Sequence, residues 1–405
     1  MLVCAATGAT IQSVKPEQYP LRSGCEEEDE TVAVLHAGDK VEVRFGLAGA
    51  SVPCYAVTAT VDGGKVNGYL PGSVLDHVDD LERERRAARS VEIPKIVTRA
   101  AEGLRAQPLR VGPQPMLDAI RLLEASQPRQ ALEVLETALR LHPKDPALLA
   151  LAGMAAHRSD QLALARSYWQ ESLALRHDPE IERLYRKLEK ETAADRSGQQ
   201  LFATRFTLRY DDAVVDSETA RLVVGVLEEE YSRISYQLGC RPDERMTAIL
   251  QSREAYMRAT DAAEWSGGMF DGRIRVPVPQ TRVVSPELRR TLAHETVHAC
   301  LASIGSWPAW LHEGLAQKLS GAVLAPSVKQ KFQAMARAGA LPRLNRLGQS
   351  WSRMSANHAS AAYGLALAAV ETYFDRYREF GIQNLLRNSE MLPRVADELD
   401  EYLRQ

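Results

Sequence analysis

The chain has 405 residues, and at roughly 150 residues per domain this length suggests two to four domains. Apolar residues make up 45% and charged residues 25%, a balance that provides enough apolar side chains for a real core. Lys and Arg number 50 against 53 Asp and Glu, so the net charge of −3 argues against the broad positive surface of a nucleic-acid binder. No run approaches the roughly 18 apolar residues of a membrane-spanning helix, so none is expected.

Residues 1–78 have the pattern of short β-strands joined by glycine-containing turns. Apolar and charged residues alternate from Val41, and Asp62-Gly63-Gly64 between two further runs is typical of a hairpin turn. Strands and turns at this spacing predict a small β-barrel. The stretches LHAGDKVEV, PCYAV and GKVNGYLP, in this order, resemble bacterial Src-homology-3-like domains. That resemblance implies a module that binds cell-wall components or peptides, although a capping domain without a ligand fits the pattern equally well.

Residues 79–115 are charge-rich and helical in composition, and they end in several prolines and a glycine, so we expect a linker. Residues 116–198 show a helical period throughout. Three apolar positions recur 34 residues later: Ala131, Leu139 and Leu141 are followed by Ala165, Leu173 and Leu175. This period resembles tetratricopeptide repeats over about two units, which implies a peptide-binding groove or, as the favoured alternative, a helical spacer. Fewer than three such units are marginal alone, so the segment is expected to pack on its neighbours.

Residues 199–405 predict a mixed α+β region. The expected fold class is therefore multi-domain, with a small β-barrel, then a helical repeat segment, then an α+β domain. Phe202–Tyr210 alternates like a strand, Ser217–Leu238 is amphipathic over the length of a helix, and Met246 begins a second strand. Helices are expected to dominate from Ser285 onward, and the candidate metal-binding and catalytic residues lie among them.

The pattern His-Glu-Thr-Val-His begins at His294 and has the spacing of a metal-binding helix. Residues four apart on a helix lie about 40° apart around its axis, so His294 and His298 can reach one ion. Glu295 lies beside the pair, where a carboxylate can take a proton from a metal-activated water. The five-letter pattern also occurs by chance, in which case both histidines would be ordinary core residues.

The surrounding sequence favours the metal-binding interpretation. Ser285 and Pro286 form a helix start, with the serine as N-cap and the proline at the first helical position. From Thr291 to His312, Glu295 is the only residue with an obligate charge, so the helix is expected to be buried. A carboxylate in such a helix is costly without a partner or a cation nearby, and two histidines at the right spacing supply a reason for its presence.

A second helix, expected over Pro308–Ser320, carries the next candidate ligand. The stretch WPAWLHEGLA begins at Trp307 and contains Glu313 and Gly314, and the glycine is expected to allow close packing on the first helix. The two motifs in this order, H-E-x-x-H and W-x-x-E-G-x-A, resemble the gluzincin metallopeptidases. They are most similar to the compact bacterial families that combine such a domain with tetratricopeptide repeats. The resemblance covers about 200 residues.

The resemblance implies one Zn²⁺ ion with three protein ligands, His294, His298 and Glu313. It also implies that Glu295 is the general base. His312 is a rival third ligand, because neighbours on a helix point about 100° apart and only one of them can face the ion. The motif favours Glu313. Gln317, one turn beyond it, can hydrogen-bond a ligand histidine from behind, or it can be an ordinary exposed glutamine.

Upstream of these helices, the sequence around Asp271-Gly272 predicts a hairpin. Gluzincins bind their substrate as an extra strand along a sheet edge before the active helix, and this hairpin resembles that edge. The resemblance implies substrate contacts through five residues: Gly267, Gly268, Arg273, Ile274 and Arg275. An edge strand that binds nothing is the alternative.

Peptide hydrolysis also needs a hydrogen-bond donor to the oxyanion besides the metal. His358 and Tyr363 are candidates, and a tyrosine near this point in the related families favours Tyr363, although core packing explains either residue. The sequence therefore predicts a zinc-dependent peptidase acting on a peptide or protein, with endopeptidase action favoured. Two alternatives stay open: an assembly or peptide-binding scaffold with an inactive or autoinhibited peptidase domain, and a zinc amidase acting on cell-wall peptides. The repeats and the barrel can hold a protein or cell-wall partner.

The cellular compartment is left open by the sequence. Five cysteines form no recognisable disulfide framework, and Cys25 and Cys54 can pair only in an oxidising compartment, with separate buried thiols as the alternative. The apolar first residues lack the basic start of a complete export signal, although they can be the remnant of one. The wall-type barrel and this apolar start favour a periplasmic or extracellular location.

Overall fold

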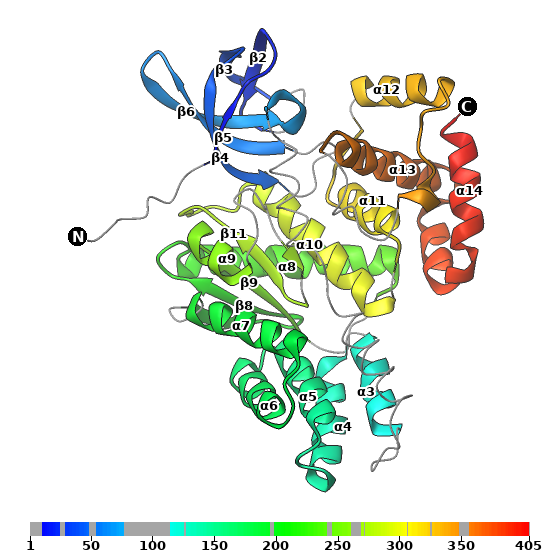
Figure 1. Ribbon diagram of the computed structural model, residues 1–405. Helices are drawn as coiled ribbons and strands as arrows, with labels where there is room; N and C mark the ends of the chain where they lie inside the picture. Colours follow the sequence, from blue (N-terminus) through cyan, green and yellow to red (C-terminus); the bar gives the residue numbers. More distant parts are fainter. Residues whose placement is uncertain are drawn as a thin grey trace.

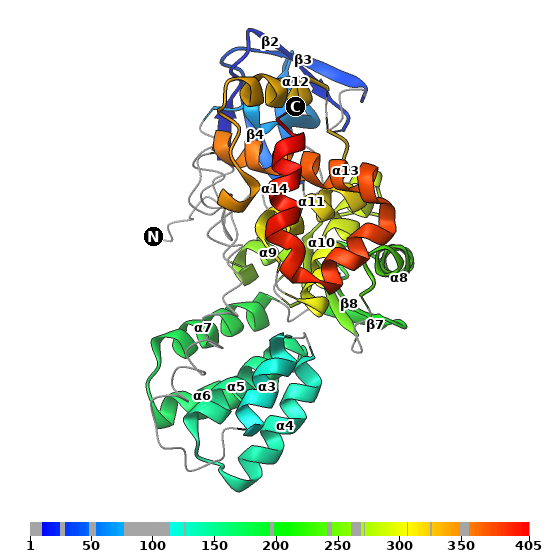
Figure 2. The same cartoon turned by 90° about the vertical axis from the view of Figure 1, so that its right-hand side faces the viewer.

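The computed structural model shows three successive parts of the chain (Figure 1). The described residues are 10–24, 29–47, 54–76, 114–124, 127–194, 198–240, 245–260, 269–270, 272–305, 307–324, 326–347 and 356–404. An antiparallel sheet comes first, a helical segment second and an α+β region third, which is the order expected from the sequence. In both views the α+β region lies between the N-terminal sheet and the helical segment (Figure 2).

The N-terminal sheet has six described strands, and every neighbouring pair is antiparallel. They are β1 (Thr10–Ser13), β2 (Gln18–Arg22), β3 (Thr31–His36), β4 (Lys40–Leu47), β5 (Cys54–Val61) and β6 (Gly64–Pro71), in the order β1-β4-β5-β6-β2-β3. The predicted turn joins β5 to β6, where Asp62 and Gly63 both have positive φ (51° and 79°) as a type I′ turn requires. Tyr55 pairs with Leu70 across this hairpin, and both are fully buried in a core belonging to the sheet.

Five described helices form the second part of the chain. They are α3 (Gln114–Glu124), α4 (Pro128–Leu141), α5 (Pro146–Arg158), α6 (Leu162–Leu175) and α7 (Pro179–Ala194). The linker expected over residues 79–115 lies outside the described residues except for its last two, which begin α3. Of the three pairs that recur 34 residues apart, Ala131 on α4 and Ala165 on α6 are both fully buried, whereas Leu141 and Leu175 are both exposed. Trp169 fills this core beside Gly153, where a Cβ atom would lie only 2.3 Å from the indole.

The third part contains a five-stranded mixed sheet with the order β10-β11-β9-β8-β7. Its strands are β7 (Gly198–Phe202), β8 (Phe206–Asp211), β9 (Met246–Gln251), β10 (Met269–Phe270) and β11 (Ile274–Pro277). Strands β8, β9 and β11 are parallel, while β7 and β10 are antiparallel edge strands. The single strand expected over Phe202–Tyr210 is wrong, because the chain turns at residues 203–205 and its two ends belong to β7 and β8, which pair with each other.

Seven described helices complete this part. They are α8 (Ser217–Leu238), α9 (Arg253–Thr260), α10 (Pro286–Ile304), α11 (Ala309–Leu319), α12 (Pro326–Arg337), α13 (Ala356–Arg387) and α14 (Leu392–Tyr402). Helix α10 contacts both α8 and α11, and α11 contacts α13. At Gly314 a Cβ atom would lie 2.4 Å from the backbone oxygen of Ala366, so the close packing expected there brings α11 onto α13 rather than α10. None of the described helices combines the length and the apolar character that a bilayer span requires.

A disulfide joins the end of α8 to α10. Cys240 follows α8 and Cys300 lies two residues after His298; both are fully buried and their Cα atoms are 5.6 Å apart. Cys54 is also disulfide-bonded, to a partner outside the described residues, so its pairing with Cys25 stays a prediction. The expectation that the cysteines form no disulfide framework is therefore wrong. Cys240 and Cys300 are 60 residues apart, and no local pattern marks such a pair.

Replacing both Cys240 and Cys300 by alanine is expected to lower the thermal midpoint of unfolding. The bond closes a loop of 60 residues, and the chain entropy that it removes from the unfolded state is worth about 4 kcal/mol. Each kcal/mol shifts the midpoint of a unit of this size by roughly 2–4 °C, so a loss of about 8–16 °C is expected in thermal unfolding. An unchanged midpoint in the variant would contradict a stabilising bond.

Candidate metal centre

Helices α10 and α11 bring potential metal ligands together from two neighbouring segments. Helix α10 begins as predicted: the Ser285 hydroxyl accepts a hydrogen bond from the Leu288 amide at 3.2 Å, and a proline occupies the first turn. His294 and Glu295 are each 2% exposed, so this part of the helix is buried as expected. Helix α11 begins and ends within one residue of its predicted bounds and carries Glu313.

The ligand atoms of the His-His-Glu group converge with the spacing that a single ion requires. His294 Nε2 lies 3.1 Å from His298 Nε2, and Glu313 Oε2 lies 3.6 Å from the first nitrogen and 3.8 Å from the second. The two imidazole planes are nearly perpendicular, at 86°. A tetrahedral ion with bonds of about 2.0–2.2 Å separates its ligand atoms by roughly 3.3–3.5 Å. The three side chains therefore fit around one ion, and the group can hold a metal.

His312 lies beside His298 instead of joining this group. The Nδ1 atoms of the two rings are 2.7 Å apart, the ring centroids are 4.9 Å apart, and the planes are tilted by 32°. Burial lowers the pKa of His312 to about 4, a shift that Glu313 opposes and His294 reinforces. The ring is therefore neutral at neutral pH, with one nitrogen unprotonated. Of the two rivals for the third ligand, Glu313 is the one that the structure brings to the histidines.

Gln317 connects α11 to α13 rather than supporting a ligand histidine. Its side-chain amide donates to the backbone carbonyls of Glu313 and Tyr363, each at 3.1 Å, and the side chain is 1% exposed. The sequence left two alternatives, a bond to an imidazole and an exposed glutamine, and the structure shows neither, because this face of α11 packs on the neighbouring helix. The residue that does contact a ligand ring is His312, which the sequence presented only as a rival ligand.

The two described residues that were predicted to handle protons, Glu295 and Tyr363, are both buried. Glu295 follows His294 directly on α10. Tyr363 lies on α13, which contacts α11; its side chain is 9% exposed and its backbone carbonyl accepts the bond from Gln317. The side chain of His358, the other candidate for the oxyanion, lies outside the described residues. The roles of Glu295 and Tyr363 stay predictions.

The segment predicted to bind substrate differs from an open edge. The hairpin exists, with β10 antiparallel to β11 and Gly272 at a φ of 97°. However, β11 pairs with β9 on its other side, so β10 is the edge strand. Gly267 and Gly268 lie outside the described residues. The other three residues of the segment are at most 1% exposed: Arg273, Ile274 and Arg275. Their side chains do not line an open surface, because the arginines point toward the helical segment.

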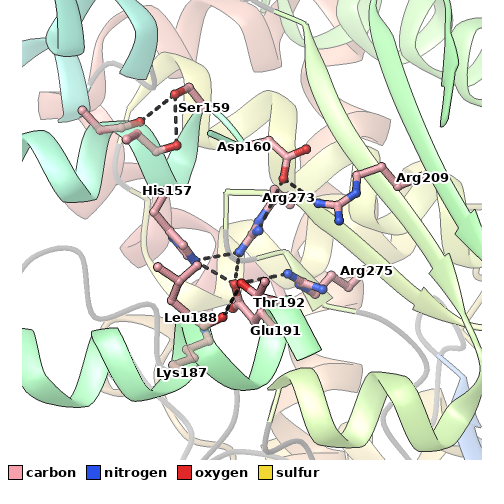
Figure 3. A network of polar contacts seen from close by, with 12 residues as sticks. His157, Ser159, Asp160, Lys187, Leu188, Glu191, Thr192, Arg209, Arg273 and Arg275 are labelled. Atoms are coloured by element: carbon pink, nitrogen blue, oxygen red, sulfur yellow. Dashed lines mark hydrogen bonds and ion pairs between the residues drawn. The ribbon is translucent and has the colours of Figure 1, made fainter. Parts of the chain in front are cut away.

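Both arginines enter a buried cluster of charges centred on Glu191 of α7 (Figure 3). The Glu191 carboxylate lies 2.7 Å from Arg273 and 2.8 Å from the His157 ring on α5. Arg275 lies 3.5 Å from the same oxygen. Burial disfavours the charged form of this carboxyl, but Arg273, His157 and Arg275 outweigh burial and hold the pKa of Glu191 well below its usual range. Glu191 is therefore ionised at neutral pH.

A second carboxylate extends this cluster toward the sheet. Asp160, in the turn between α5 and α6, lies 2.9 Å from Arg209 of β8 and 3.5 Å from Arg273, which immediately precedes β11 (Figure 3). The helical segment is thus tied to two strands of the sheet, and one of them leads into α10. The expected packing of the repeats on their neighbour takes place here. No motif marked these residues, because His157, Asp160 and Glu191 are spread over separate helices and turns.

Comparison of the chain with protein-family models, with curated proteins and with solved structures finds no match. No relative therefore tests the resemblance drawn from the two motifs. The convergence of His294, His298 and Glu313 is what a functional interpretation of this chain has to explain.

Proposed function

We propose that this protein is a zinc-dependent peptidase with a gluzincin-like catalytic domain. The observation that carries the proposal is the convergence of His294, His298 and Glu313 from two packed helices. Two imidazoles and a carboxylate are the ligand set of zinc peptidases, and three protein ligands leave a fourth position for water or substrate. Imidazole nitrogens favour zinc over magnesium and calcium, which prefer oxygen ligands throughout.

Glu295 is the general base in this proposal. A zinc ion held by the group supplies Lewis acidity, which lowers the pKa of a water molecule and polarises the scissile carbonyl. Glu295 takes a proton from the attacking water and returns it to the departing amine. Its position directly after His294 in the helix and its burial away from bulk solvent support this role. Tyr363 is the proposed donor to the oxyanion.

The proposed substrate is a peptide or protein bound as an additional strand. Strand β10 is at the edge of the sheet and contacts α10, which carries both histidines. Main-chain groups of an edge strand can pair with an extended peptide. Gly267 and Gly268 precede β10 along the chain, and their contact with substrate belongs to this proposal. Endopeptidase action is favoured because the sequence lacks a Gly-x-Met-x-Asn aminopeptidase signature.

The preceding parts of the chain complete the proposed architecture. The N-terminal sheet is a small Src-homology-3-like barrel and the helical segment is a pair of tetratricopeptide-like units, and either can hold a protein or cell-wall partner. An oxidising compartment, periplasmic or extracellular, is supported by the Cys240–Cys300 bond and by the disulfide at Cys54, since such bonds persist in oxidising surroundings.

Metal analysis and a degradation assay on the same purified chain test this proposal. One zinc ion per chain is expected, together with cleavage of a denatured protein that a chelator abolishes and added zinc restores. Zinc without any cleavage would favour the scaffold with an inactive peptidase domain. Cleavage of isolated cell-wall peptides, but not of denatured protein, would favour the zinc amidase. A chain that binds no metal would exclude both the zinc peptidase and the zinc amidase.

Replacing Glu313 by alanine is expected to release the ion. The variant loses one of three ligands, so its zinc affinity should fall by more than the roughly 10–100-fold typical of changes outside the ligand set. The measurement is zinc per chain after dialysis. Glu287→Ala, on α10 but outside the ligand group, is the matched control and should keep its zinc. Unchanged zinc in the Glu313 variant would remove that carboxylate from the ligand set and point to His312 instead.

A further inference from the structure

We propose that His312 positions the zinc ligand His298: its Nδ1 atom accepts a hydrogen bond from Nδ1–H of His298 and so directs the Nε2 lone pair of that ring toward the ion. The inference rests on the metal-binding part of the proposed function and adds a residue to it. His312 is outside the ligand group and acts through His298, so it is a positioning residue.

The contact between the two rings is short and comes from two helices that also supply the ligands. The Nδ1 atoms are 2.7 Å apart, which is hydrogen-bond distance. The backbone amide of His312 donates to the Pro308 carbonyl at 3.0 Å, so His312 lies in the first turn of α11. Glu313 is the next residue of the same turn. One rigid turn therefore supplies a ligand to the ion and a support to the ligand on the facing helix.

The position of one proton decides what this contact does. A neutral imidazole has one N–H donor and one acceptor nitrogen, so a bond between two Nδ1 atoms contains a single proton. If His298 carries that proton, its Nε2 atom is an unprotonated ligand facing the carboxylate of Glu313 at 3.8 Å. If His312 carries it, His298 is protonated at Nε2 and cannot bind a metal. An ion in the group therefore requires His312 to be the acceptor and to carry its own proton on Nε2.

The two ligand histidines differ in this support. Within the described residues, the buried Nδ1 atom of His294 makes no hydrogen bond, whereas Nδ1 of His298 has His312. An acceptor behind a metal-bound imidazole fixes its tautomer and orientation, and its loss typically weakens metal affinity by about 10–100-fold. We therefore expect that loss of His312 lowers zinc affinity. The affinity should depend on an acceptor atom at the place of Nδ1 of His312.

Three variants separate an acceptor at that position from simple packing. In His312→Asn the side-chain oxygen can occupy the place of Nδ1, since both atoms are bonded to Cγ. In His312→Gln the amide lies one bond farther along, near the place of Nε2, and His312→Leu has no acceptor. Zinc affinity, measured by competition with a coloured chelator, should fall about 10–100-fold in the Leu and Gln variants and stay within about threefold of wild type in Asn. Thermal unfolding of the metal-free proteins is the control for folding.

Nitrogen NMR of the zinc-loaded wild-type protein gives a direct second measurement. Nδ1 of His298 should be protonated and Nδ1 of His312 should not be. The proposal is overturned if the Leu variant binds zinc as tightly as wild type, if Gln rather than Asn restores affinity, or if the proton is found on Nδ1 of His312. Because these readouts need no turnover, a chain that binds zinc but cleaves nothing would contradict the peptidase activity alone. Wild-type affinity in the Leu variant of an active enzyme would contradict only the role of His312.

Discussion

Glu295→Gln is expected to keep the metal and to abolish peptide hydrolysis. The amide has nearly the same shape as the carboxylate, and Glu295 is not one of the three ligands, so zinc per chain should be unchanged. The glutamine amide cannot accept a proton at neutral pH, so it assists neither the attack by water nor the departure of the amine. Loss of a general base typically costs about 10²–10⁴-fold, which should appear in kcat. The measurement is cleavage of a denatured protein at saturating zinc.

A matched variant is needed to assign that loss to chemistry. Glu287→Gln makes the same change nearer the start of the same helix, α10, and outside the ligand group. It should leave both zinc content and turnover near wild type. Full turnover by the Glu295 variant would remove this residue from the mechanism. Loss of zinc together with activity would instead give Glu295 a role in holding the ion.

Local signals were sufficient for the two helices that form the candidate centre. Ser285 acts within one turn, and the spacing of His294 and His298 is a property of a single helix, so neither depends on the rest of the fold. Glu313 is different, because it lies on another helix. Its convergence with the histidines followed only from the resemblance of its motif, and the structure brings the three ligand atoms together.

Contacts between distant segments could not be derived in the same way. The predicted hairpin indicated a strand beyond Gly272, but it did not show which element covers each face of that strand. Arg273 meets a carboxylate 82 residues away, at Glu191. The angle between neighbours on a helix showed that His312 and Glu313 cannot both face one ion. It could not show that His312 would meet the Nδ1 atom of His298, since that depends on how α11 packs on α10.

Glu191→Ala is expected to destabilise the helical segment and the sheet together. The substitution leaves Arg273, Arg275 and His157 buried without this carboxylate, and breaking a buried ion pair from one side costs about 3–5 kcal/mol. At roughly 2–4 °C per kcal/mol, the midpoint of thermal unfolding should fall by about 6–20 °C. The effect should exceed that of any exposed ion pair, because water cannot replace the lost carboxylate at a fully buried position.

Glu189→Ala provides the control on the same helix. Glu189 pairs with Arg166 at 2.9 Å, but both side chains are substantially exposed (38% and 51%), so its removal should cost at most about 1 kcal/mol. If the buried cluster joins the helical segment to the α+β region, loss of helical signal and loss of bound zinc should occur in one thermal transition. Glu191→Ala should lower the midpoint of that whole transition. Equal shifts in the two variants, or a separate helical transition that leaves zinc bound, would show that the segment folds independently. Arg273 immediately precedes β11, the strand that leads toward α10, so loosening its anchor is expected to reach the helix that carries both histidines.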